Sequence, residues 1–311
     1  MNPELTRLAL VARRHVKTVS GAVVGPIVVA LMRLARLAKR ERMANVCGAF
    51  MRRAGPWLPE HRTGRANLKA AFPDKSPQEI EAILAGVWDN LGRVAAEFPH
   101  LHRMRLLDIK RPGPADVIVD AVTDKHFHDM RDGGRATLLF ASHLANWEVP
   151  ALIAAHFGLD TYVLYRPPNL RAAAGAVVKI RAGLMGTLVP SGFDAPIRLA
   201  NALERGSHVG MLVDQYDVKG VDVTFFGRTC KVSPLLAQLA RHLDCPIRGA
   251  RTVRLAGGNQ LRAELTAPIE PARDAQGRID IQGTMQAVTS VVEGWVREHP
   301  EQWLWLHRRW R

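Results

Sequence analysis

The sequence predicts an α/β fold in a single domain, with a mostly parallel central sheet flanked by helices. From about residue 110 onward, short apolar runs that end in polar turns alternate with helical stretches, and this alternation is typical of a parallel sheet covered by helices. Between residues 60 and 107, apolar residues recur at helical spacing, which predicts a helical layer ahead of the sheet. The predicted strands are residues 136–141, 161–164, 208–213 and 246–253, and residues 195–204 form a predicted helix.

One helix start is marked clearly in the helical layer, at Ser76-Pro77-Gln78-Glu79. Serine is favoured at the cap, proline at the first helical position, and a glutamate three residues after the cap bonds back to its backbone. Apolar residues then recur at helical spacing as far as Trp88. The helix at residues 195–204 is followed by Gly206, a residue type that often closes helices.

The N-terminal region, residues 1–40, combines basic and apolar residues and is predicted to be separate from the main domain, residues 41–311. Residues 18–32 carry no charge, but this stretch is shorter than the ~20 residues that span a bilayer as a helix. A cleaved signal peptide, a short spanning anchor, a helix lying on an anionic membrane and a helix packed on the protein's own core all compete here. We favour a helical membrane-associating segment, because basic and apolar residues are interleaved after residue 32.

The charge balance suggests an anionic partner. Lys and Arg total 43 against 29 Asp and Glu, which gives a net charge of +14. Such an excess fits nucleic acid, an acidic membrane surface or an acidic protein. The sequence shows no helix-turn-helix, zinc or aromatic-basic strand signature, and we therefore expect no nucleic-acid partner.

No metal or cofactor is predicted. The three cysteines, Cys47, Cys230 and Cys245, are widely spaced and have neither a zinc-ligand spacing nor a disulfide framework. The glycine pairs Gly133-Gly134 and Gly257-Gly258 are typical of turns and do not form a phosphate-binding loop.

The segment from Ala141 to Glu148, Ala-Ser-His-Leu-Ala-Asn-Trp-Glu, is the strongest candidate for a reactive site. It follows a predicted strand, and reactive groups in open α/β sheets gather at the carboxyl ends of strands. A bent connection could bring the Glu148 carboxylate back to one nitrogen of His143. The other nitrogen would then face a pocket as a proton acceptor, as a general base requires. The alternative is a histidine that is satisfied inside the fold.

The spacing of His143 and Glu148 resembles the H-x4-D/E motif of the glycerolipid acyltransferase superfamily. Four further segments, in the same order along the chain, are similar to those of the late, lauroyl- and myristoyl-type acyltransferases of lipid A biosynthesis. They are W-D-N-L-G-R-V-A-A-E at 88–97, Y-R-P-P-N at 165–169, D-Q at 214–215 with F-F-G-R at 225–228, and the C-terminal 300–310. The resemblance covers about residues 60–311.

This resemblance implies a glycerol-3-phosphate acyltransferase-like fold and an enzyme that works at the cytoplasmic face of the bacterial inner membrane. It implies transfer of a fatty acyl chain from an acyl carrier protein thioester to a hydroxyl of an anionic lipid A precursor. His143 would be the general base and Glu148 would orient it. A different lipid acceptor, such as a lysophospholipid or glycolipid, with acyl-coenzyme A as donor, remains the alternative.

Most of the remaining site residues are assigned from the resemblance. Arg166 and Arg181 would hold anionic groups, and Asp214 with Gln215 would lie at the same sheet edge as His143. Asn169 follows Pro168 directly, where the family often has spacer residues, and this leaves the acceptor less defined than the reaction. The other candidate substrate-binding residues are Asn146 in the turn and Phe225, Phe226 and Gly227, which would line an acyl channel or form an ordinary hairpin.

Overall fold

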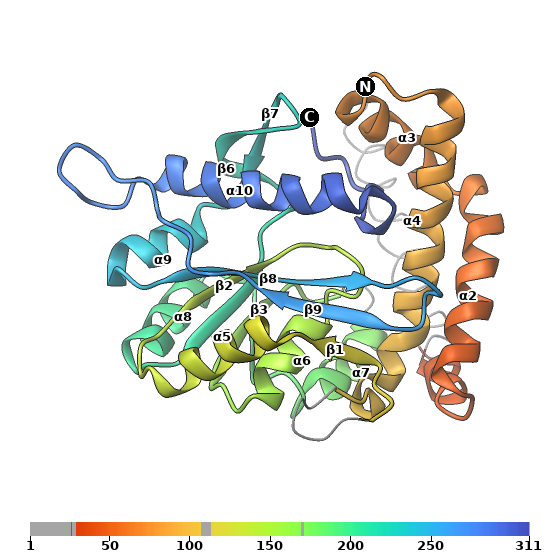
Figure 1. Cartoon of the computed structure of the whole chain (residues 1–311), viewed down its shortest axis with the longest axis horizontal. Helices are drawn as coiled ribbons and strands as arrows, with labels where there is room; N and C mark the ends of the chain where they lie inside the picture. Colours follow the sequence, from red (N-terminus) through yellow and green to blue (C-terminus); the bar gives the residue numbers. More distant parts are fainter. Residues whose placement is uncertain (1–25, 27–28, 107–112, 169–170, 311) are drawn as a thin grey trace, which may run out of the picture.

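In the computed structural model, residues 26, 29–106, 113–168 and 171–310 are described (Figure 1). Their main sheet has the strand order β1-β9-β8-β2-β5-β3-β4, and the neighbouring strands from β8 to β4 are all parallel. Strand β9 runs antiparallel to β8. The bounds are β1 Val117–Val119, β2 Leu138–Ala141, β3 Thr161–Tyr165, β4 Thr187–Pro190, β5 His208–Leu212, β8 Ile247–Arg254 and β9 Leu261–Leu265. The predicted α/β fold with a mostly parallel sheet is thus confirmed.

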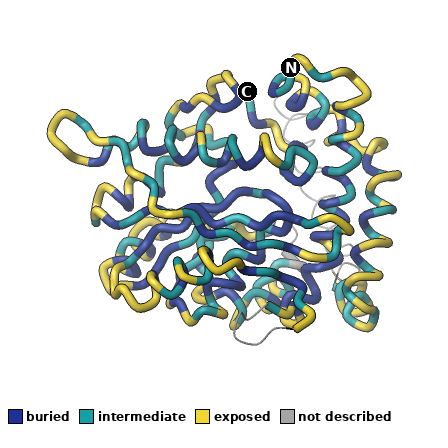
Figure 2. Tube along the Cα trace, viewed as in Figure 1, coloured by how far each residue is buried: buried dark blue, intermediate teal, exposed yellow. Residues whose placement is uncertain are grey.

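Helices cover both faces of this sheet. They are α5 Ala121–Asp132, α6 Val149–His156, α7 Arg171–Arg181, α8 Ala195–Glu204, α9 Leu235–Leu243 and α10 Ile281–Glu298. Consecutive side chains on a strand point to opposite faces. Accordingly, Leu139 of β2 packs in one hydrophobic cluster with α5 and α6, while its neighbour Phe140 packs in a second cluster with α8, α9 and α10. Figure 2 shows the sheet as a buried layer between more exposed elements.

A layer of N-terminal helices stands at one end of the sheet, drawn in orange in Figure 1. It comprises α2 Arg40–Ala54, η1 Gly55–Trp57, α3 Pro59–Ala71, α4 Pro77–Glu97 and η2 Phe98–Arg103. The predicted cap of α4 is confirmed, because Ser76 and Glu79 each bond the other's backbone N–H. Helix α2 packs closely along α4 where Gly92 meets the backbone of Cys47, and any side chain at residue 92 would collide with that backbone.

A two-stranded antiparallel hairpin, β6 Tyr216–Phe225 and β7 Arg228–Val232, follows β5 and lies beside α10. Its turn is formed by Phe226 and Gly227, both with positive φ angles, +51° and +69°. Two residues with positive φ are required by the turn that best fits the twist of a hairpin. Phe226 and the preceding Phe225 are both buried.

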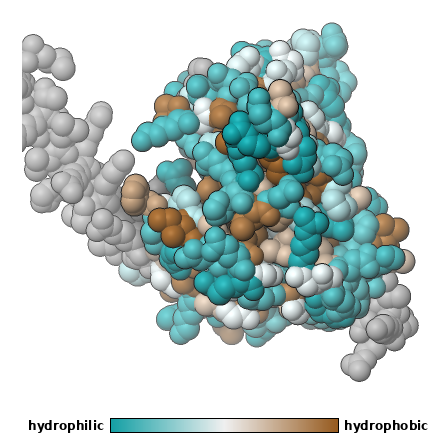
Figure 3. Space-filling model, turned by 90° about the vertical axis from the view of Figure 1, so that its left-hand side faces the viewer, coloured by the Kyte–Doolittle hydropathy of each residue, from teal (hydrophilic) through white to brown (hydrophobic). Residues whose placement is uncertain are grey.

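The predicted membrane-associating segment lies largely outside the described residues, and the division at residue 40 therefore stays a prediction. Within the described part of the chain, no helix combines the length and the apolar character needed to cross a bilayer. The described N-terminal region nevertheless exposes large apolar side chains, among them Leu34, Leu37, Phe50 and Trp57. Elsewhere, the face drawn in Figure 3 is largely hydrophilic, with smaller hydrophobic areas between the hydrophilic residues.

Candidate active site

The turn between β2 and α6, residues 143–148, carries the predicted reactive histidine. It is held against the C-terminal segment, because Ala145 N–H donates to Gln302 O at 2.9 Å and Leu304 N–H donates to His143 O at 3.1 Å. Ala145 has a φ of +45°, a left-handed conformation that residues other than glycine seldom adopt. The surrounding contacts therefore determine the conformation of this turn.

The carboxylate bonded to the His143 ring belongs to Asp214. The Nδ1–H of His143 donates to Asp214 Oδ1 at 2.8 Å, and the backbone N–H of His143 donates to Oδ2 at 2.7 Å. Oδ2 also accepts from Trp303 Nε1–H at 2.7 Å. Asp214 follows β5, which pairs in parallel with β2, and the carboxyl ends of the two strands therefore lie side by side. Asp214 thus fixes both the ring and the backbone of His143.

The expectation that Glu148 bonds to His143 was wrong for this structure. Among the described residues, the Glu148 carboxylate instead pairs with Arg181, whose Nε and Nη2 donate at 2.8 and 2.5 Å. The Arg181 guanidinium also lies over the rings of Phe98 and Tyr165. The physical reason is that Glu148 stands at the start of α6, where α7 offers it a charged partner, while Asp214 already occupies the Nδ1 side of the ring.

The electrostatics of the site favour a charged His143–Asp214 pair. Burial by itself would lower the pKa of His143, but the charge and hydrogen bond of Asp214, and then the charge of Glu148, outweigh burial and raise that pKa above its usual value. Burial also opposes ionisation of Asp214, yet His143 and the hydrogen bonds that Asp214 accepts lower the pKa of Asp214 to about 2. Asp214 therefore stays ionised at neutral pH.

His143 lines a cavity together with Gln215. When the ring is neutral and Nδ1 donates to Asp214, Nε2 is left as an acceptor. The Gln215 amide nitrogen lies 3.3 Å from Nε2. The ring of Trp147 lies 5.2 Å from the His143 ring and the ring of His307 lies 6.4 Å from it. Burial, and then the charge of His143, lower the pKa of His307. This arrangement suits a general base that accepts a proton at Nε2.

The cavity has a volume of about 740 Å³, within the range of about 300–1,000 Å³ that is typical of small-molecule sites. Its polar lining includes His143, Arg166, Gln215 and His307. Its apolar lining comes from β2, β3, β5 and α6 and includes Leu139, Val163, Gly210 and Ala154. The cavity therefore combines a largely apolar lining with a proton acceptor. Among the described residues, no group of three or more His, Cys, Asp or Glu side chains gathers to hold a metal ion.

The model of a family described as bacterial lipid A biosynthesis acyltransferase matches residues 13–311. The chain belongs to this family. A comparison with curated proteins gives no match. The protein is therefore an acyltransferase of lipid A biosynthesis, and the cavity next to His143 is its candidate active site.

The structure brings some of the predicted site residues of this acyltransferase to the cavity and places others elsewhere. Arg166, Arg181, Glu148 and Gln215 line the cavity together with His143. Asn146 is fully buried and bonds to Glu97, which lies away from the cavity lining. Asn169 lies outside the described residues.

Phe225, Phe226 and Gly227 are not among the described residues that line the cavity. Phe225 packs against Trp303 with ring centroids 5.5 Å apart, and Phe226 packs against Trp305 at 5.7 Å. These residues form the hairpin turn and its aromatic core, which was the other interpretation of their sequence.

Two residues that the sequence left out of the site are Trp303, which bonds to Asp214, and His307, which lines the cavity. Both lie in the C-terminal segment that resembles the family's. That resemblance was the available signal.

Proposed function

We propose that this acyltransferase moves a fatty acyl chain from an acyl carrier protein thioester to a hydroxyl of a lipid A precursor. The observation that carries the proposal is the His143 ring, which has Nδ1 fixed by Asp214 at 2.8 Å and lines a cavity of about 740 Å³. An apolar cavity fits a fatty acyl chain. Membership of the family supplies the lipid A context.

In this mechanism, His143 Nε2 takes the proton of the acceptor hydroxyl as its oxygen attacks the thioester carbonyl carbon. Asp214 stabilises the imidazolium that forms, as a buried carboxylate does in hydrolytic triads. Collapse of the tetrahedral intermediate breaks the carbon–sulfur bond, and the imidazolium returns its proton to the thiolate. Arg166, at the cavity lining, would bind an anionic group of the donor or acceptor. Glu148 adds negative charge near the ring while paired with Arg181.

We place the enzyme at the cytoplasmic face of the inner membrane, in keeping with its lipid acceptor. The exposed Leu34, Leu37 and Phe50 of the N-terminal region support this location. Basic residues such as Arg33 and Arg42 stand among them in the sequence, and a mixture of apolar and basic residues favours an anionic lipid surface.

The test is acyl transfer by the full chain in detergent, with a lipid A precursor that lacks secondary acyl chains and a panel of acyl carrier protein thioesters. A precursor heavier by one acyl chain in mass spectrometry is the expected result. Parallel reactions contain acyl-coenzyme A, or a lysophospholipid as the acceptor. If product formed only with acyl-coenzyme A, the donor would be coenzyme A and not the carrier protein. If product formed only with the lysophospholipid, the acceptor would be that lipid and not the lipid A precursor.

The cavity also predicts a residue that sets the length of the accepted chain. Gly210 of β5 lines the cavity, and a methyl group there would have Thr161 as its nearest neighbour, at 4.0 Å. We expect Gly210→Leu to fold and to fill part of this space. Competition between thioesters of different lengths should show preference moving to shorter chains by about tenfold or more, since each buried methylene contributes ~0.8 kcal/mol. Gly210→Ala, the matched control, should change the preference little. An unchanged preference in the leucine variant would place the acyl chain elsewhere.

A further inference from the structure

An ion pair is buried directly behind the 143–148 turn, on the side away from the cavity. Glu97, at the end of α4, is completely buried, and Arg254, at the end of β8, is 8% exposed. Arg254 Nη1 and Nη2 donate to the two Glu97 carboxylate oxygens at 2.6 and 2.9 Å. A buried ion pair of this kind is often no more stabilising than apolar side chains of similar size, because both charges lose their hydration. Stability alone is therefore a weak reason for its presence.

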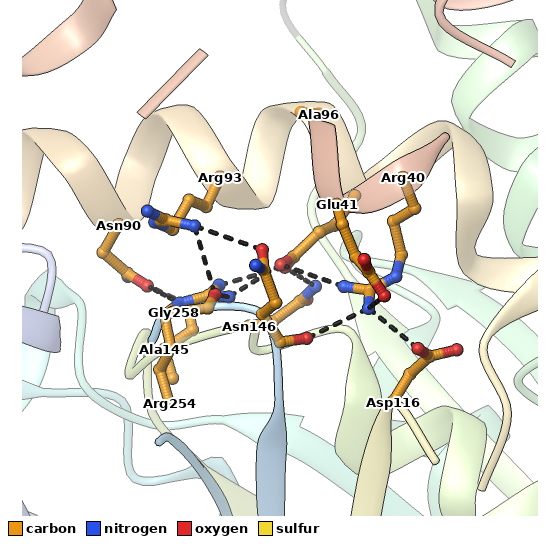
Figure 4. Close-up of polar contacts among 12 residues, drawn as sticks. Arg40, Glu41, Asn90, Arg93, Ala96, Asp116, Ala145, Asn146, Arg254 and Gly258 are labelled. Atoms are coloured by element: carbon orange, nitrogen blue, oxygen red, sulfur yellow. Dashed lines mark hydrogen bonds and ion pairs between the residues drawn. The ribbon is translucent and has the colours of Figure 1, made fainter. Parts of the chain in front are cut away.

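The ion pair is joined to the turn through Asn146 (Figure 4). Asn146 Nδ2–H donates to Glu97 Oε2 at 2.9 Å, and its Oδ1 accepts from the Glu148 backbone N–H at 3.2 Å. The Asn146 backbone carbonyl accepts from Thr252 Oγ1 at 2.9 Å. The carboxamide is thus held at both ends, and neither end is free for substrate.

A second set of hydrogen bonds links Arg254 to Ala145, the residue of the turn with the left-handed backbone conformation. Together with the bonds of Asn146, these hydrogen bonds form the network behind the turn. Asn90 Oδ1 accepts from Arg254 Nε at 2.9 Å. Asn90 Nδ2–H donates to Ala145 O and to Gln302 O, both at 3.1 Å. Ala145 is the residue with a φ of +45°, and such a conformation persists only where surrounding contacts impose it. Figure 4 shows Asn90, Asn146 and Arg254 converging beneath α4.

We propose that Glu97, Arg254 and Asn146 are positioning residues that keep the His143 ring directed into the cavity and against Asp214. None of the three is among the described residues that line the cavity, and any effect on catalysis must therefore pass through the turn. His143 stands before the two anchored residues of the turn, Ala145 and Asn146, and Glu148 stands after them. This inference rests on the proposed function, in which His143 is the base.

The test begins with Asn146→Ala, which removes the bond to Glu97 and the bond to the Glu148 backbone. We expect kcat to fall about 10- to 100-fold with little change in KM, since misplacement of a catalytic group by about 1 Å can cost a factor of 10². A second readout is the titration of His143 followed by NMR. The charged and titratable groups around the ring are Asp214, Glu148 with Arg181, and His307. Weaker contact with Asp214 should lower the pKa of His143.

A second variant, with a smaller structural change, keeps the test valid if Asn146→Ala fails to fold. Thr252→Val preserves the side-chain volume and removes a single hydrogen bond to the turn. We expect a fall in kcat and a lowering of the His143 pKa, both smaller than in Asn146→Ala. The matched control is Glu264→Gln on β9, which disturbs the partly buried ion pairs of Glu264 with Arg251 and Arg262, away from the turn. It should leave kcat and the His143 titration unchanged. A Glu97→Gln and Asn146→Ala double-mutant cycle should be strongly non-additive in kcat, because both changes act on one link.

The outcomes separate this inference from the proposed function. Normal kcat and a normal His143 titration in folded Asn146→Ala and Thr252→Val would overturn the positioning role, even if both variants melted at lower temperature. Failure of the wild-type enzyme to transfer an acyl chain would overturn the proposed function. In that case the His143 titration still decides whether the network positions the ring.

Discussion

Replacing His143 with alanine should lower kcat by about 10²–10⁴-fold, the usual contribution of a general base. The ring accepts the proton at Nε2 in the proposed mechanism, and the methyl group of alanine offers no acceptor there. Steady-state transfer from an acyl carrier protein thioester to the lipid A precursor measures the effect. KM should change little, because the cavity that binds the acyl chain keeps its apolar lining.

The variant should remain folded, which thermal unfolding can verify. His143 lies at the cavity lining, and its removal leaves Asp214 two further donors, the backbone N–H of residue 143 and Trp303. His242→Ala on α9, whose side chain is 61% exposed, is the matched control and should behave as wild type. Added imidazole should restore part of the lost turnover. Near-normal turnover in His143→Ala would remove His143 as the base.

Replacing Asp214 with asparagine should have the second-largest effect, a fall in kcat of about 10³–10⁴-fold if the wrong imidazole tautomer is then favoured. Asparagine keeps the shape of the side chain, but its NH₂ group can donate to Nδ1 and leave Nε2 protonated. The Nε2 atom would then no longer accept a proton from the hydroxyl.

The same variant has a predicted pH signature. In the wild type, activity requires neutral His143, and it should be lost as the pH falls through a raised pKa, above the ordinary value of about 6.5. Asp214 has a pKa of about 2 and is ionised throughout this range. Loss of its charge lowers the pKa of His143, and the acidic limb of kcat/KM should therefore move to lower pH in Asp214→Asn.

Glu148→Gln is the comparison that separates the two carboxylates. Its amide can still bond to Arg181, and the charge it removes acts on His143 without a hydrogen bond. We expect a smaller fall in kcat and a smaller displacement of the acidic limb than in Asp214→Asn. If the Glu148 variant showed the larger changes in both, Glu148 would be the orienting carboxylate, as its spacing from His143 first suggested.

Much of the fold could be predicted because its signals are local. The capping box at Ser76 and Glu79 involves residues three apart, and α4 starts there as expected. Strand β2 was recognised from a short apolar run, and its end placed His143 at the carboxyl edge of the sheet. Residues 1–25, by contrast, lie outside the described structure, and the membrane association of segment 1–40 remains a prediction.

The sequence by itself determined the α/β class, the family resemblance and the position of His143 at the end of a strand, since each depends on neighbouring residues. Only the tertiary structure decided which carboxylate meets the ring. Asp214 is 71 residues from His143 and reaches it because β5 pairs with β2. Glu148, five residues away, is drawn instead to Arg181 on α7. Strand order and helix packing bring distant charges together, and spacing along the chain does not encode these partners.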